Sequence, residues 1–156
     1  MKILMICLGN ICRSPLAEGI LQDKIVKNNL NWTVDSAGTG GWHVGELPDH
    51  RSVAIARKYH IDLTRQRARQ FQREDLDAFD LILAMDKSNL RYILKYAETD
   101  EQRAKARLIL NFSRPQSDFE VPDPYYDNSF ELVYGLLDEA CEGVISNLKD
   151  FKFKEP

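Results

Sequence analysis

The chain has 156 residues, of which 44% are hydrophobic and 29% are charged, and its formal net charge is −3. This length fits a single domain over residues 1–156, with a core that needs neither disulfides nor metals. The net charge argues against a nucleic-acid or anionic-membrane partner, and no apolar run reaches membrane-spanning length. Three cysteines without zinc-type spacing predict a reducing, cytoplasmic location.

Strands and helices alternate along the chain. The apolar run of residues 3–8 predicts a buried central strand, and Ser14-Pro15 then predicts a helix start with serine as the cap. Patterning predicts the later elements in this order: strand 32–36, helix 49–60, strand 80–85, a helix from 88, strand 108–112 and a helix over 133–148. Such alternation predicts an α/β fold with a parallel sheet and helices on both faces.

Two further segments complete this prediction. Residues 113–128 contain three prolines and no periodicity, which predicts a long functional loop. Cys141 lies on the apolar stripe of the last helix and is expected to pack in the core. Ligands of such folds bind beyond the carboxyl ends of the strands, where the loop after the first strand is expected to lie.

That loop has the residues of an anion site. It reads Cys7-Leu8-Gly9-Asn10-Ile11-Cys12-Arg13-Ser14. Curled into a cradle, its backbone N–H groups and the helix N-terminus converge on one point, which favours phosphate. The same field, together with the Arg13 guanidinium, favours the thiolate form of Cys7. Cys7 is therefore the predicted nucleophile.

Other side chains of the loop support this interpretation. Arg13 offers a planar fork of donors for two phosphoryl oxygens, and Ser14 can donate to the sulfur of Cys7. Gly9 is expected to allow a backbone conformation that a side chain would block, and Asn10 to brace the loop. An isolated Cys-x5-Arg match more commonly marks a core cysteine and a surface arginine. The strand, the glycine and the cap favour the phosphate site.

A phosphatase also needs an acid for the leaving group, and Asp123 is the candidate. It lies in Val121-Pro122-Asp123-Pro124-Tyr125-Tyr126-Asp127, where prolines stiffen the backbone and tyrosines supply aromatic walls. Alone, this segment is typical of a turn. Combined with a thiolate loop, it predicts a general acid.

The chain resembles the low-molecular-weight protein tyrosine phosphatase family over nearly its whole length. The resemblance rests on the loop from Cys7 to Pro15, the Trp42 segment, Met85-Asp86-Lys87-Ser88-Asn89-Leu90 and Asp123-Pro124-Tyr125-Tyr126, in that order. It implies a four-stranded parallel sheet flanked by helices, two-step hydrolysis, and neither a metal nor another cofactor. It also implies a phosphotyrosine-containing protein as partner, a tyrosine kinase being one candidate.

The resemblance also implies roles for individual residues. Cys7 would form a phosphocysteine, Arg13 would bind the phosphoryl group, and Asp123 would act first as acid and then as base. It implies that Asn10, Ser14 and Ser36 support the loop. It also implies that the rim of a deep slot for aryl phosphates is formed by Trp42, Tyr125 and Tyr126.

Two positions leave their roles open. Cys12 matches a cysteine that traps the oxidised nucleophile as a disulfide in the family, while simple packing is an equal alternative. Gln66 stands where the family often has histidine, so support of the loop is expected to differ there.

Several alternatives remain in view. Arsenate reductases of the same fold relay electrons through downstream cysteines, which the middle of this chain lacks. Protein-arginine phosphatases have threonine where Ile11 stands. A noncatalytic phosphotyrosine-binding module would need neither Cys7 nor Asp123. His43, beside Trp42, is a candidate for the pocket rim, although an exposed loop residue is the favoured interpretation. The arginines of residues 65–73 are interpreted as a solvated face rather than as a contact for acidic substrates.

Overall fold

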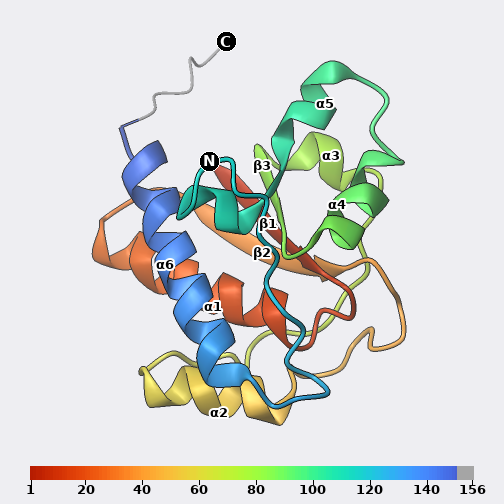
Figure 1. The fold of residues 1–156 in the computed structure, drawn as a ribbon. Helices are drawn as coiled ribbons and strands as arrows, with labels where there is room; N and C mark the ends of the chain where they lie inside the picture. Colours follow the sequence, from red (N-terminus) through yellow and green to blue (C-terminus); the bar gives the residue numbers. More distant parts are fainter. Residues whose placement is uncertain (151–156) are drawn as a thin grey trace.

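The computed structural model describes residues 1–150 as a parallel sheet covered by helices on both faces (Figure 1). Its strands lie in the order β2-β1-β3-β4, and every neighbouring pair is parallel. Their bounds are β1 Lys2–Cys7, β2 Thr33–Gly38, β3 Leu81–Ala84 and β4 Ala106–Leu108. The predicted four-stranded parallel α/β fold is therefore confirmed.

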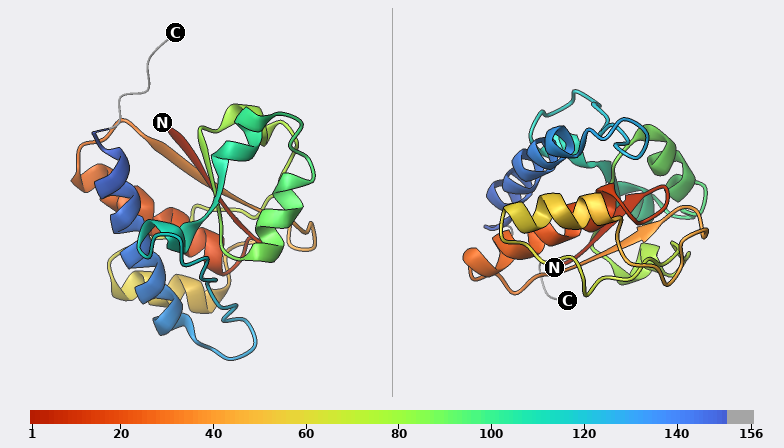
Figure 2. Two further views of the ribbon diagram at one scale, coloured as in Figure 1. Left: turned by 45° about the horizontal axis from the view of Figure 1, so that its top comes forward. Right: turned by 90° about the horizontal axis from the view of Figure 1, so that it is seen from below.

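The helices divide between the two faces of the sheet. They are α1 Arg13–Lys27, α2 His50–Lys58, α3 Asp75–Ala78, α4 Lys87–Leu94, α5 Asp100–Lys105, the 3-10 helix η1 Ile109–Phe112, and α6 Phe130–Leu148. In the left view of Figure 2, α1, α2 and α6 cover one face, and α3, α4 and α5 cover the other. Both sides of the central strand are thus buried.

Strand β1 shows why its sequence is an unbroken apolar run. Ile3 and Met5 point into the core beneath α1 and α6, whereas Leu4 and Ile6 point into the second core on the opposite face. Alternate side chains of a strand face opposite sides of the sheet, so a doubly covered strand needs apolar residues at every position. The strand ends at Cys7, which places the nucleophile candidate at the carboxyl edge.

Two sequence predictions for the second half of the fold need correction. The fourth strand covers Ala106–Leu108 rather than 108–112, because the chain turns into η1, where Ile109 and Leu110 are buried in the core shared with α6. The short helices α3 and α5 were not predicted. They are four and six residues long, too short for a periodic apolar stripe to appear in the sequence.

The last helix and the loop before it follow the sequence closely. Cys141 is fully buried on the inner face of α6, as predicted, and residues 113–128 contain neither a strand nor a helix. Among the helices of residues 1–150, none is both long and apolar enough to cross a membrane.

Candidate active site

The phosphate loop occupies the carboxyl edge of the central strand, between the end of β1 and the start of α1. Strand β2 runs beside it, with Gly38 paired to Cys7. A Cβ atom added at Gly38 would come within 2.8 Å of the Leu8 carbonyl oxygen, so only glycine lets the loop pass this closely. Backbone N–H groups of Thr39 and Gly40 donate to the carbonyls of Cys7 and Leu8, at 2.9 Å each.

Ser14 faces the sulfur of Cys7 from inside the first turn of α1. The helix begins at Arg13 and its N-cap is Cys12, so the prediction of Ser14 as the cap is wrong. The Ser14 hydroxyl oxygen instead lies 3.0 Å from Cys7 Sγ, and it accepts a hydrogen bond from Asn10 Nδ2 at 2.9 Å. Ser14 is fully buried, so its hydroxyl is committed to these two neighbours.

Asn10 orients a buried chain of hydrogen bonds behind the loop. Its Oδ1 accepts from the backbone N–H of Arg69 at 3.0 Å, which fixes the amide so that Nδ2 faces Ser14 and Ser36. Ser36 donates its hydroxyl hydrogen to Glu18 Oε1 at 2.8 Å. Because Ser14 already accepts from Asn10, its own hydrogen is available to donate to the sulfur of Cys7.

Gly9 and Asn10 have different roles in the loop. Asn10, not Gly9, has the left-handed backbone, with φ 57°. The missing side chain at Gly9 makes room for a neighbour, since an added Cβ would lie 3.1 Å from the ring of His43. His43 lines the pocket and its Nδ1 lies 2.6 Å from Glu46 Oε2, so the structure favours the pocket-rim interpretation of His43 over that of an exposed loop residue.

Arg13 is buried and held from behind. Its Nη1 donates to Asp86 Oδ2 at 2.8 Å and to the Val121 carbonyl at 3.0 Å, and its Nη2 lies 3.9 Å from Asp123 Oδ2. Burial opposes the charge, but the negative groups of Cys7, Asp86 and Asp123 outweigh it and raise the pKa of the guanidinium above its ordinary value. The Arg13 guanidinium is therefore permanently charged, and its orientation is fixed by these hydrogen bonds.

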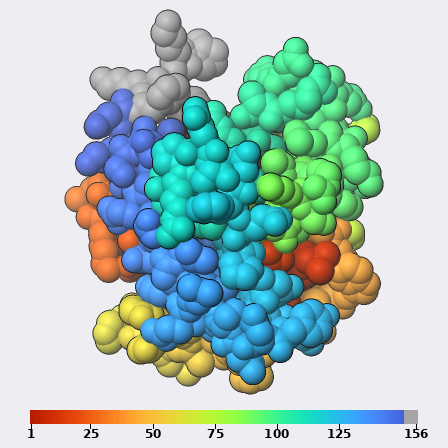
Figure 3. All heavy atoms as spheres, viewed as in Figure 1, coloured from red at the N-terminus to blue at the C-terminus, as the bar shows by residue number. Residues whose placement is uncertain are grey.

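One pocket of about 320 Å³ brings the predicted site residues together. It is lined by Cys7, Leu8, Gly9, Ile11, Cys12, Arg13, Trp42, His43, Asp123, Tyr125 and Tyr126. Asn10, Ser14 and Ser36 do not line it but form the support behind its floor. In Figure 3 red atoms of the N-terminal part of the chain remain visible between the green atoms near α4 and the light-blue atoms of the 113–128 loop.

The pocket has a polar floor and an aromatic rim. Cys7 and Arg13 at the floor are each 3% exposed, whereas Trp42 is 72% and Tyr126 is 88% exposed at the rim. Asp123 stands between them, with its side chain partly exposed and its Oδ1 accepting from the Tyr125 backbone N–H at 3.1 Å. A dianion can therefore sit at the bottom while an aromatic group passes the rim.

The three cysteines differ in their surroundings. All are free, and burial followed by the negative charges of Asp49, Cys7 and Asp123 raises the pKa of Cys12 to about 12. Burial likewise raises the pKa of Cys141 to about 12. Cys12 and Cys141 are therefore protonated at neutral pH. Among the three cysteines, Cys7 alone has a side-chain hydroxyl within hydrogen-bond distance of its sulfur, that of Ser14 at 3.0 Å.

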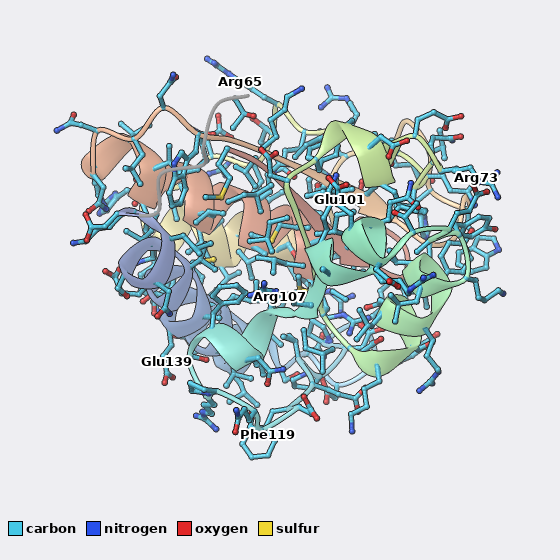
Figure 4. The ribbon with its side chains drawn as sticks, turned by 90° about the horizontal axis from the view of Figure 1, so that it is seen from above. Arg65, Arg73, Glu101, Arg107, Phe119 and Glu139 are labelled. Atoms are coloured by element: carbon cyan, nitrogen blue, oxygen red, sulfur yellow. The ribbon has the colours of Figure 1, made fainter. Side chains whose placement is uncertain are left out.

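The basic run of residues 65–73 divides in two. Arg65 and Arg73 lie at the edge of the molecule and point away from it (Figure 4). Arg69 is different, because its guanidinium bonds to Asp35 and Asp75 while its backbone N–H holds Asn10. Of the four arginines in this run, Arg69 is thus part of the loop's support, whereas Arg73 forms an ion pair with Glu98 at the surface. Within residues 1–150, no cluster of three or more His, Cys, Asp or Glu side chains is arranged to hold a metal ion.

Comparison with known proteins identifies the family. The model of the low molecular weight phosphotyrosine protein phosphatases matches residues 2–153. The chain belongs to this family. A low molecular weight phosphotyrosine protein phosphatase of Sus scrofa is 39% identical over 153 residues, which span 95% of this chain and 96% of the relative. The crystal structure of YfkJ from Bacillus subtilis aligns with a TM-score of 0.92 and 37% identity, covering 98% of this chain and 97% of that one.

Membership defines the reaction class. The chain is a protein-tyrosine phosphatase, a hydrolase of phosphate monoesters whose substrates are phosphotyrosine-containing proteins. A structure titled as a Drosophila arginine phosphatase is also similar, with a TM-score of 0.89 and 34% identity over 97% of this chain and all of that one. The fold alone therefore does not separate the two leaving groups.

Two contributors to the site escaped the sequence analysis. Asp86 was noted only as part of a family landmark, and Glu18 was not singled out. Asp86 carries one local signal, since it caps α4 in a capping box with Asn89. For the partnership of Asp86 with Arg13, and of Glu18 with Ser36, no local pattern exists because the partners are 73 and 18 positions apart.

Proposed function

We propose that this phosphatase works through a phosphocysteine formed on Cys7. The sulfur of Cys7 attacks phosphorus, and the bond from phosphorus to the tyrosyl oxygen breaks. The electron pair goes to that oxygen, which takes the proton of Asp123. Asp123 then accepts a proton from water as the water oxygen attacks phosphorus and expels the Cys7 thiolate, which releases inorganic phosphate.

Supporting side chains act on charge rather than on bonds. Arg13 holds two phosphoryl oxygens as the group flattens, because Asp86 and the Val121 carbonyl fix its fork. Ser14 donates to the sulfur both before attack and as it departs. The observation that carries the proposal is that Cys7, Arg13 and Asp123, which come from distant parts of the chain, line the same pocket.

The pocket's shape supports a preference for phosphotyrosine. Its charged residues lie at the buried floor, and the exposed rings of Trp42, Tyr125 and Tyr126 stand at the entrance. A phosphoserine side chain is too short to bring its phosphate to the floor past this rim. We extend the proposal to a protein partner such as a tyrosine kinase, in the cytoplasm, where free cysteines persist.

Phosphoarginine is the second candidate substrate, because of the similarity to an arginine phosphatase. Ile11 lines the pocket with an apolar side chain. An apolar wall fits a phenol ring better than a guanidinium group, which needs hydrogen-bond partners when it is buried. We therefore expect phosphotyrosine peptides to be hydrolysed faster than phosphoarginine peptides of the same sequence.

The deciding experiment measures steady-state hydrolysis of phosphotyrosine, phosphoserine and phosphoarginine peptides by the wild type and by Cys7→Ser. We expect turnover of phosphotyrosine by the wild type, and none by Cys7→Ser on any substrate. Cys141→Ser is the matched control, since Cys141 is buried and does not line the pocket, and it should keep the activity. Undiminished turnover by Cys7→Ser would refute the proposal.

The acid has a test of its own. Asp123→Ala should lose at least tenfold more kcat/KM on phosphotyrosine than on p-nitrophenyl phosphate, because only a poor leaving group needs the proton. Equal losses on both substrates would remove Asp123 from the acid role while leaving Cys7 in place.

A further inference from the structure

Arg51, in the first turn of α2, contacts both Asp49, which is bonded to the phosphate loop, and Tyr125, in the loop that carries Asp123. In Figure 1 the chain leading into α6 passes beside this end of α2. On one side the Arg51 guanidinium donates to the Tyr125 carbonyl in that passing chain. On the other side it donates to Asp49, the N-cap of its own helix. Nothing in the proposed catalytic steps uses Arg51, so its many contacts call for a separate explanation.

One side of this arrangement is fixed to the phosphate loop. The backbone N–H of Asp49 donates to the Ile11 carbonyl at 2.7 Å, and the Ser52 hydroxyl donates to the Cys12 carbonyl at 3.1 Å. Asp49 in turn accepts from Arg51 Nε at 3.0 Å, from its Nη2 at 3.1 Å and from its backbone N–H at 2.9 Å. The guanidinium is thereby anchored in the frame of the nucleophile.

This anchor persists at neutral pH. Burial opposes ionisation of Asp49, but the hydrogen bonds and charge of Arg51 outweigh it and hold the pKa of that carboxyl below its usual range. The same carboxylate raises the pKa of Arg51. Both partners are therefore charged at neutral pH, and the two hydrogen bonds from Nε and Nη2 to Asp49 fix the guanidinium plane.

The other side holds the loop that carries the acid. Arg51 Nη1 donates to the Tyr125 carbonyl at 3.0 Å and to Asn128 Oδ1 at 2.5 Å. Its guanidinium carbon also lies 5.3 Å from the ring centre of Tyr125 and 4.8 Å from that of Phe130.

The contact with Tyr125 leads directly to the proposed acid. The backbone N–H of Tyr125 donates to Asp123 Oδ1 at 3.1 Å, while its carbonyl accepts from Arg51 and its ring forms part of the pocket wall. One residue thus joins the acid, the wall and the guanidinium. Movement of Tyr125 relative to Cys7 would displace Asp123 with it.

We propose that Arg51 is a positioning residue that fixes the distance and angle between the Asp123 carboxyl and the Cys7 loop. It does so by holding Tyr125 to Asp49, so its effect reaches the chemistry only through Asp123 and the pocket wall. This inference rests on the proposed role of Asp123 as acid. Lysine cannot replace arginine here, because a single ammonium cannot bond to Asp49 in a plane and also reach Tyr125 and Asn128.

The test compares Arg51→Ala and Arg51→Lys with Arg57→Ala. Arg57 is exposed on the same helix, and its side chain makes no hydrogen bond or ion pair with residues 1–150, so it controls for charge. We expect both Arg51 variants to lose roughly 30-fold in kcat/KM on a phosphotyrosine peptide and about threefold on p-nitrophenyl phosphate, because a displaced acid matters only for the poor leaving group. Arg57→Ala should match the wild type on both substrates.

A double variant separates positioning from loss of fold. If Arg51 acts through Asp123, then Arg51→Ala added to Asp123→Ala should cost less than threefold further on the phosphotyrosine peptide. The rate of Cys7 alkylation by iodoacetate in Arg51→Ala should stay within twofold of the wild type, since the phosphate loop is intact. Equal losses on both substrates, or losses that multiply in the double variant, would overturn the inference.

These outcomes are distinct from failure of the proposed function. Turnover by Cys7→Ser would refute the proposed function whatever Arg51 does. A dependence on leaving group in Asp123→Ala, without one in Arg51→Ala, would refute only the positioning role.

Discussion

The phosphate loop and the loop that carries Asp123 form two halves of one pocket, but they are built in opposite ways. In the phosphate loop Asn10, Arg13 and Ser14 are buried polar residues. Asn10 and Arg13 bond to other parts of the fold, and Ser14 bonds to Cys7 and Asn10 within the loop. In the other loop Tyr125 and Tyr126 are exposed, and Asp123 bonds to a backbone N–H two residues away.

The difference follows from what each half must do. Stabilising charge on a phosphoryl group requires donors that are already in place, and a buried network resists rearrangement. Admitting a protein side chain requires an open entrance, where exposed aromatic rings give contact area at little entropic cost. We therefore expect substitutions in the first half to reduce catalysis steeply, and substitutions at the rim to act mainly on substrate binding.

Arg13→Lys should give the largest effect. Lysine keeps the positive charge but loses the fork that Asp86 and Val121 aim at the phosphoryl group. We expect kcat to fall by roughly 10³-fold, the loss seen when a transition-state donor is removed. Arg57→Lys is the matched control and should leave kcat unchanged. A loss below tenfold for Arg13→Lys would mean that charge alone suffices.

Asn10→Gly tests the buried network without adding strain. Glycine tolerates the left-handed backbone, but the bonds to Ser14, Ser36 and the Arg69 N–H are lost. Leaving buried polar groups unpaired should lower the free energy of unfolding by about 2 kcal/mol, measured by urea denaturation, and kcat/KM about tenfold. Asn29→Gly is the control, because Asn29 has φ 53° on the surface. Similar losses in both variants would contradict a role for the network.

Substitution at the rim should be milder. Tyr126→Ala and Trp42→Ala remove exposed rings at the pocket entrance, so KM for a phosphotyrosine peptide should rise about threefold while kcat changes less than twofold. Phe119→Ala is the control. Phe119 is also an exposed aromatic residue, but it lies at the edge of the molecule and does not line the pocket (Figure 4). A fall in kcat larger than the rise in KM would erase the distinction between floor and rim.

Glu18→Gln should show the smallest effect, through pH. Burial raises the pKa of Glu18 from 4.5 to about 7, with Asp35 adding to the rise and Ser36 and Arg69 opposing it. The folded chain therefore holds this proton more firmly than the unfolded chain, so stability falls as pH rises from about 5 to 7 and then levels off.

Glutamine keeps the hydrogen bond from Ser36 but does not titrate. Relative to Glu18→Gln, the wild type should lose about 1 kcal/mol of unfolding free energy between pH 5 and pH 8, after allowance for solvent screening. Urea denaturation of both proteins at the two pH values measures this difference. Parallel pH dependence in the two proteins would show that folding does not change the pKa of Glu18.

Local patterns predicted those parts of the site that are contiguous in the chain. The run from Cys7 to Ser14 contains the strand end, the loop and the helix start, so its place at the sheet edge followed from periodicity. The cap was misplaced by two residues, because the hydroxyl of Ser14 is used by Asn10 and the sulfur instead of the helix terminus. The left-handed backbone of Asn10 was not predicted, since its strain is offset by side-chain bonds to distant parts of the fold.

The sequence by itself determined the alternation of strands and helices, the loop from Cys7 to Ser14 and the aromatic segment around Asp123, because each depends on residues close together in the chain. Only the tertiary structure decided which distant groups meet: Asp86 behind Arg13, Glu18 behind Ser36, and Arg51 between the two loops. Each of these contacts forms when elements pack against one another, and no periodicity along a single segment encodes the neighbour of a side chain across the fold.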